Sequence, residues 1–99
     1  MYSRNFYKDL DRTKIKMDVE KEGYHPLVIS NDAGFVYHEH QHPETKLLVC
    51  LEGNMKVWTQ GKEYNFMPGD KLIIPGNTKH KAVVGKTGCT FFWSEKIVV

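Results

Sequence analysis

Hydrophobic and polar residues alternate over short runs through most of the chain, from residue 24 onward. Successive side chains of a β-strand point to opposite faces, so this period predicts strands with one buried face. Glycine, proline, asparagine and aspartate separate the runs, as they do in turns. About eight closely spaced strands are typical of an all-β barrel or sandwich. The predicted strands cover residues 27–30, 35–40, 46–51, 55–59, 63–66, 72–74, 80–84 and 89–94, and a further short run at the end covers 97–99.

The N-terminal part of the chain has a different pattern. Ile15 and Val19 are apolar positions at helical spacing within the charged stretch 11–22, and Gly23 follows where a helix C-terminal cap is expected. This pattern predicts a short amphipathic helix. Ile15, Met17 and Val19 also alternate, so a strand is the competing interpretation.

Composition indicates one folded domain. The chain has 99 residues, of which 40% are hydrophobic and 12% aromatic, enough for a single core. We divide it into an N-terminal segment, 1–23, and a β-barrel domain, 24–99. Cys50 and Cys89 lie in separate apolar runs without the spacing of a zinc site, which predicts buried free thiols.

Charge and hydropathy restrict the kinds of binding partner and the cellular location that we expect. The formal net charge is only +2, and the lysines are scattered rather than gathered in a basic stripe with aromatic residues. Nucleic acid is therefore not an expected partner. No apolar run approaches the ~18 residues of a membrane span, and the polar N-terminus lacks the apolar stretch of a secretory signal. We expect a cytoplasmic protein.

Histidines provide the strongest chemical signal. His38, His40 and His42 occupy alternate positions, which places their side chains on one face of an extended chain. His80 begins another predicted strand, directly after a turn segment. Neutral imidazoles from two strands are a common basis for a divalent transition-metal site, with Fe, Mn, Ni, Cu or Zn as candidate ions.

Two ordered motifs around these histidines resemble those of the cupin superfamily, in particular its small single-domain members. The first motif is carried by Gly34, His40, His42, Lys46 and Gly53, and the second by Gly69, Pro75, Gly76, Asn77 and His80. The resemblance implies a double-stranded β-helix, or jelly-roll barrel, with His40, His42 and His80 as the metal ligands. It also implies dioxygenase, isomerase or decarboxylase chemistry on a small acid.

The chain departs from the cupin pattern at the position of the usual glutamate ligand, which is Lys46. An ammonium group has no lone pair to donate and repels a metal ion. Lys46 could instead be a solvated residue at the barrel mouth, an anchor for an anionic ligand, or a base or amine nucleophile. Asn77 and Val84 are milder departures, at positions where the second motif usually has glycine and asparagine.

A shifted register recovers a carboxylate ligand. His38, His40 and Glu44 repeat the spacing of the motif, but this register changes the distance to Gly53. We therefore prefer the register of His40 and His42, and treat His38 as either an extra ligand or an ordinary strand histidine. Glu44 follows Pro43 in a predicted loop, where it is either exposed or a substitute ligand. Cys50 shares the strand parity of Lys46, which predicts that it lines the same pocket.

A second set of apolar residues has the strand parity opposite to that of the residues predicted to point inward, which predicts an apolar outer face of the sheet. Such a face requires a cover, which could be the N-terminal helix or a second subunit. Cupins are similar in often forming C2 dimers, so we predict a homodimer. The residues concerned are Leu47, Val49, Trp58, Ile73 and Phe92.

Three functions are compatible with these patterns. The leading hypothesis is a small cupin that binds a divalent metal through three histidines and acts on or senses a small anionic molecule. The second is a metal-free ligand-binding or sensor module in which Lys46 anchors the anion. The third is a scaffold whose barrel holds no ligand.

Overall fold

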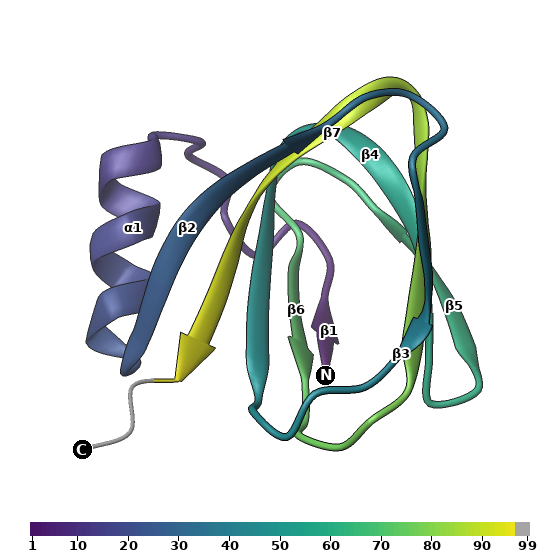
Figure 1. Cartoon of the computed structure of the whole chain (residues 1–99). Coiled ribbons are helices and arrows are strands. Elements are labelled where there is room, and N and C mark those ends of the chain that lie inside the picture. Colours follow the sequence, from purple (N-terminus) through teal and green to yellow (C-terminus); the bar gives the residue numbers. More distant parts are fainter. Residues whose placement is uncertain (97–99) are drawn as a thin grey trace.

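The computed structural model describes residues 1–96, which form one antiparallel sheet curled into a barrel and one helix packed outside it (Figure 1). The predicted strand at 97–99 lies outside the described residues. The jelly-roll barrel with a short N-terminal helix is thereby confirmed. The elements are β1 (Tyr2–Ser3), α1 (Arg12–Lys21), β2 (Tyr24–Asn31), β3 (Val36–His40), β4 (Lys46–Thr59), β5 (Lys62–Phe66), β6 (Lys71–Ile74) and β7 (His80–Lys96).

Two long strands, β4 and β7, organise the sheet. They contain 14 and 17 residues and pair with each other from Lys46↔Glu95 to Thr59↔His80. The remaining strands join one or the other half of this pair, in the order β1-β6-β4-β7-β2, with β3 on β7 and β5 on β4. Both long strands therefore contribute residues to both halves of the barrel.

Each long strand is continuous, so the prediction of two separate strands in place of each one was wrong. Register shifts interrupt the β4–β7 ladder between Cys50 and Glu52 and between Gly53 and Met55. Bulges of this kind bend a strand without ending it. Gly53 has φ of 71°, and a Cβ at this position would overlap the carbonyl oxygen of Gly88. The turn-forming residues here allow close approach of two bent strands rather than a chain reversal.

Helix α1 begins and ends close to the predicted residues. The Asp11 side chain accepts a hydrogen bond of 3.1 Å from the backbone N–H of Lys14, and Gly23 follows with φ of 89°. Ile15 and Val19 are 1% and 0% exposed, whereas Met17 is 54% exposed. This is helical periodicity, so the competing strand interpretation is wrong.

The helix covers the outer face of the sheet beside β2 and the first half of β4. Its buried residues pack in one hydrophobic cluster with Tyr24, Leu47, Val49, Leu51 and Phe92, and Ile73 packs against that cluster. The cover predicted for this apolar face is therefore the helix. Trp58 lies outside the cluster and is half-buried, and the homodimer stays a prediction.

The N-terminus is attached to the barrel through a buried carboxylate. Asp70 is 2% exposed and accepts hydrogen bonds from the Tyr2 hydroxyl, from the backbone N–H of Asn5 at 2.7 Å and from that of Met67 at 2.9 Å. These bonds support the short strand β1, which pairs with β6. Strand β1 was not predicted, because two residues carry no detectable periodicity.

The barrel interior is a separate hydrophobic cluster formed by inward residues of β4, β5, β6 and β7. Cys50 and Cys89 both belong to it as free, buried thiols, as predicted, and their sulfur atoms lie 3.8 Å apart. No helix within residues 1–96 has both the length and the hydrophobicity needed to cross a membrane.

Candidate metal centre

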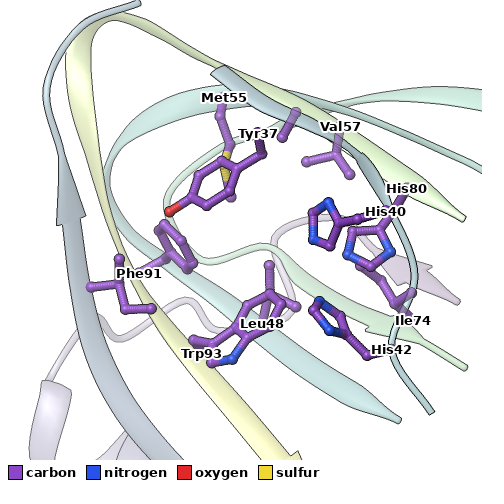
Figure 2. Close-up of a pocket in the computed structure, with 12 residues that line it drawn as sticks. Tyr37, His40, His42, Leu48, Met55, Val57, Ile74, His80, Phe91 and Trp93 are labelled. Carbon is purple, nitrogen blue, oxygen red and sulfur yellow. The ribbon is translucent and has the colours of Figure 1, made fainter. Parts of the chain in front are cut away.

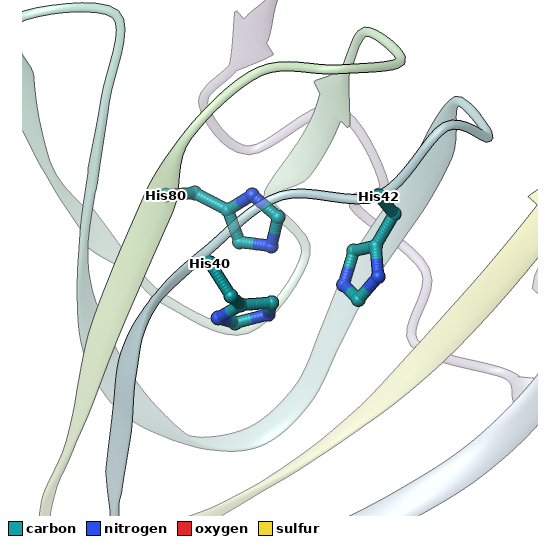
Figure 3. A group of neighbouring side chains, drawn as sticks. All are labelled: His40, His42 and His80. Atoms are coloured by element: carbon teal, nitrogen blue, oxygen red, sulfur yellow. The ribbon is translucent and has the colours of Figure 1, made fainter.

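Three imidazoles meet inside the barrel, contributed by two neighbouring strands and the loop after one of them (Figure 3). His40 ends β3 and His80 begins β7, and the two residues are register partners. His42 follows β3 by two positions, in the loop, and the centre of its ring lies 4.7 Å from that of His40. One nitrogen from each ring lies within 4.8 Å of the corresponding atoms of the other two rings.

Two of the histidines have one ring nitrogen fixed by the backbone. His40 Nδ1 lies 2.5 Å from the carbonyl oxygen of His38, and His80 Nδ1 lies 2.9 Å from that of Thr78. A carbonyl oxygen only accepts hydrogen bonds, which assigns the proton of each neutral ring to Nδ1. The lone pair on Nε2 is then free to bind a metal, and the orientation of the ring is restricted.

The other ring nitrogens include two buried atoms without a partner. Within the described part of the chain, neither His42 Nε2 nor His80 Nε2 has a hydrogen-bond partner. A buried polar atom left without a partner costs about 1–3 kcal/mol, so it is uncommon in folded proteins. Two such atoms in a cluster of three imidazoles fit the ligand set of a divalent transition-metal ion.

Burial favours the neutral form of His42 and of His80. Burial lowers the pKa of His42, and the charges of His40 and Lys46 lower it further. Burial also lowers the pKa of His80, although the hydrogen bond to the Thr78 carbonyl opposes this effect. Because metal ions bind the unprotonated ring, the effect of burial on both pKa values keeps these two rings available to a metal near neutral pH.

Lys46 lies beside this site but is bound to carboxylates. Its Nζ atom is 2.6 Å from Glu95 and 3.5 Å from Glu44, and its side chain is 7% exposed. The same atom lies 5.3 Å from the centre of the Trp93 ring. The hydrogen bond from Lys46 and its charge lower the pKa of Glu95. One positive and two negative groups thus form a compact charged cluster at the edge of the histidine site.

The remaining candidate side chains are not part of the three-ring group. His38 is exposed and contributes its carbonyl oxygen rather than its ring, and Glu44 contacts Lys46. Among residues 1–96, the group with metal-binding geometry contains only His40, His42 and His80, so the shifted register is not formed. Cys50 lies in the inner core beside Cys89 and does not line the cavity next to the histidines.

Two further residues of this region, Trp93 and Glu95, were not predicted from the sequence. Trp93 lies against His42, with ring centres 5.6 Å apart, and Glu95 pairs with Lys46. Both belong to the last part of β7, far from the motifs in sequence. The available signal was the alternation along that strand, which places Trp93 on the inner face and Ser94 on the outer face.

A cavity of about 180 Å³ opens next to the imidazoles (Figure 2). Its lining includes the three histidines, the Tyr37 hydroxyl, which donates a hydrogen bond to Asn31, and the indole group of Trp93. The rest of the lining is apolar or aromatic, contributed by Ile29, Leu48, Met55, Val57, Ile74, Ala82 and Phe91.

These features define a class of protein: a small antiparallel barrel with a three-histidine cluster beside an inner apolar cavity. Residues 28–95 match the family described as Cupin domain, and the chain belongs to this family. The resemblance seen in the two sequence motifs is thereby confirmed.

One curated relative and several solved structures are similar to this chain. A segment of 44 residues is 52% identical to the quercetin 2,3-dioxygenase of Bacillus subtilis (strain 168) and covers 44% of this chain and 12% of that enzyme. The chain thus spans only a small part of the relative. KdgF from a Halomonas species superposes with a TM-score of 0.67 at 22% identity, covering 77% of this chain and 72% of KdgF. The DMSP lyase DddQ of Ruegeria pomeroyi DSS-3 superposes with a TM-score of 0.70 at 20% identity, covering 78% and 40%.

Proposed function

We propose that this cupin binds a divalent transition-metal ion through His40, His42 and His80 and presents it to a small molecule in the adjoining cavity. The observation that carries this proposal is the pair of buried, unpartnered Nε2 atoms of His42 and His80 beside His40. A metal ion would satisfy both atoms at once. The fixed Nδ1 positions of His40 and His80 leave their Nε2 lone pairs available for it.

Such an ion would supply Lewis acidity to an oxygen of the ligand. Because three imidazoles are neutral ligands, they leave the charge of the ion uncompensated, which favours an anionic or readily ionised donor group. The residues of this chain would orient that ligand and keep water out through the apolar cavity wall. Of the reaction classes that the cupin resemblance implies, the segment similar to a dioxygenase favours oxygenase chemistry.

The alternative, in which Lys46 anchors an anion in a metal-free site, has less support. Lys46 Nζ already contacts two carboxylates, at 2.6 and 3.5 Å. An incoming anion would have to displace Glu95 or share the lysine with two groups of its own charge. We therefore assign the lysine to the charged cluster at the edge of the site rather than to the ligand.

Elemental analysis of protein purified without a histidine tag tests the proposal. We expect about one transition-metal ion per chain, and at least about 100-fold weaker metal binding in His40→Ala and His80→Ala. His38→Ala is the matched control, because this exposed histidine of the same strand should leave binding unchanged. Wild-type protein that holds no metal, and whose melting temperature does not change with added divalent ions, would contradict the proposal.

A further inference from the structure

We infer that the cavity accepts a ligand with a single small ring or a short branched chain, carrying one oxygen donor at its end. This inference rests on the proposed metal site only for the donor end. The size and the apolar character of the ligand body follow from the cavity itself.

The cavity volume limits the size of the ligand. The space beside the histidines is about 180 Å³. An apolar cavity of about 150 Å³ is known to hold benzene, whereas sites for drug-sized molecules occupy about 300–1,000 Å³. One six-membered ring with a small substituent therefore fits. A fused or linked two-ring molecule exceeds this volume and would have to extend out through the open side of the cavity.

The cavity wall determines the polarity of the ligand. Leu48, Val57, Ile74 and Phe91 present only hydrocarbon, and the Tyr37 hydroxyl is engaged with Asn31. A sugar or other polyol would bury several hydroxyl groups without hydrogen-bond partners, which strongly opposes binding. Lysine and arginine are absent from the described residues that line the cavity, so a second anionic group would also lack a partner.

The polar and apolar parts of the cavity are separated in space. Figure 2 shows the three imidazoles together on one side, with Phe91, Tyr37 and Met55 on the other. Trp93 lies between these groups and contacts His42 through its ring. A ligand would therefore place its oxygen donor toward the imidazoles and its apolar body against Phe91 and Leu48.

Two sets of binding measurements test the inference. In metal-free protein, toluene should bind and raise the melting temperature, while myo-inositol and 2-naphthol should not. In Zn²⁺-loaded protein, phenol should bind at least about tenfold more tightly than toluene, because its oxygen can reach the metal. Zn²⁺ is chosen because it is not redox-active, so binding is measured without oxidation of the probe.

Cavity-filling variants identify the binding place. Ala82→Leu and Val57→Phe should each weaken toluene binding at least about tenfold, since both residues line the cavity. Val83→Leu is the matched control, because Val83 neighbours Ala82 but is 38% exposed. The two filling variants occupy different strands, so a folding defect in one leaves the other informative.

The outcomes separate this inference from the proposed function. Equal binding of 2-naphthol or myo-inositol and toluene, or no toluene binding at all, would overturn the cavity inference. If toluene binds as expected but Zn²⁺ gives no preference for phenol, the apolar cavity stands and the metal-directed donor end is wrong. If Zn²⁺ itself does not bind, the proposed function fails, while the toluene result still tests the size limit.

Discussion

Lys46 on β4 and Glu95 on β7 form an ion pair at 2.6 Å although they are 49 positions apart in the chain. Register explains the contact, because the two residues are partners in the β4–β7 ladder. The pair shows how a lysine is tolerated beside a cluster of metal-binding residues. Its charge is offset by Glu95 and Glu44, and both carboxylates are in turn held by the lysine.

Replacing this lysine should strengthen metal binding. Lys46→Met removes a positive charge that repels a cation at His42, and it frees the two carboxylates that the lysine holds. We expect affinity for Zn²⁺, measured by competition with a chelator, to rise about tenfold. Lys56→Met is the control, since this lysine lies outside the cavity and pairs with Glu63 at 4.0 Å. If the affinity of Lys46→Met for Zn²⁺ is unchanged or weaker, the charge of Lys46 does not weaken metal binding and the prediction is wrong.

The stability of the protein should depend far more on Val19, which packs against the outer face of the sheet, than on the nearby helix residue Met17. Val19 is 0% exposed and Met17 is 54% exposed, two positions apart on α1. Val19→Ala should lower the free energy of unfolding by about 2 kcal/mol because it leaves a cavity against Leu47 and Phe92. Met17→Ala should change it by less than about 0.5 kcal/mol. Equal effects in urea denaturation would mean that the helix does not cover the sheet.

Strand alternation and helical spacing were enough to predict the helix and most strands, and the two cupin motifs predicted the meeting of His40, His42 and His80. Each of these depends on a local period or on a motif with fixed spacing. The continuity of β4 and β7 was not predictable in this way. Glycine is common both in turns and in β-bulges, and Gly53 lies beside a bulge. Only pairing with the neighbouring strand shows which of the two structures forms.

The ion pairs of Lys46 were also not predictable from local sequence patterns. Which side chain pairs with it depends on the β4–β7 register, and that register follows from packing along both strands rather than from either sequence alone. The contact between Trp93 and His42 was not predictable for the same reason, because Trp93 lies near the C-terminal end of β7 and is distant in sequence from the motif that contains His42. For Cys50, strand parity correctly predicted an inward side chain. Parity does not say whether an inward residue reaches the cavity, and Cys50 does not line it.

Alkaline pH should destabilise the attachment of the N-terminus. Burial, followed by the hydrogen bond to Asp70 and the charge of that carboxylate, raises the pKa of Tyr2 above its ordinary value near 10. Above that pH the unfolded chain loses a proton that the folded chain retains, so the contribution to stability is complete below pH 10 and falls as pH rises. Between pH 9 and 11, urea midpoints of the wild type should therefore decline more steeply than those of Tyr2→Phe. Parallel declines in the two proteins would remove Tyr2 as the cause.

Two glycines with the same backbone conformation should respond differently to a methyl group. Gly53 and Gly61 have φ of 71° and 74°, so alanine is strained at both. At Gly61 a Cβ meets no atom within 4 Å, and Gly61→Ala should lower the free energy of unfolding by only about 1 kcal/mol. At Gly53 the added carbon would overlap the Gly88 carbonyl oxygen, so the β4–β7 ladder must separate and the loss should be about 3 kcal/mol or more. Because this strain lies far from the histidines in the ladder, metal affinity of folded Gly53→Ala should match that of the wild type. Similar losses of stability in both variants would show that β4 and β7 do not require this close approach.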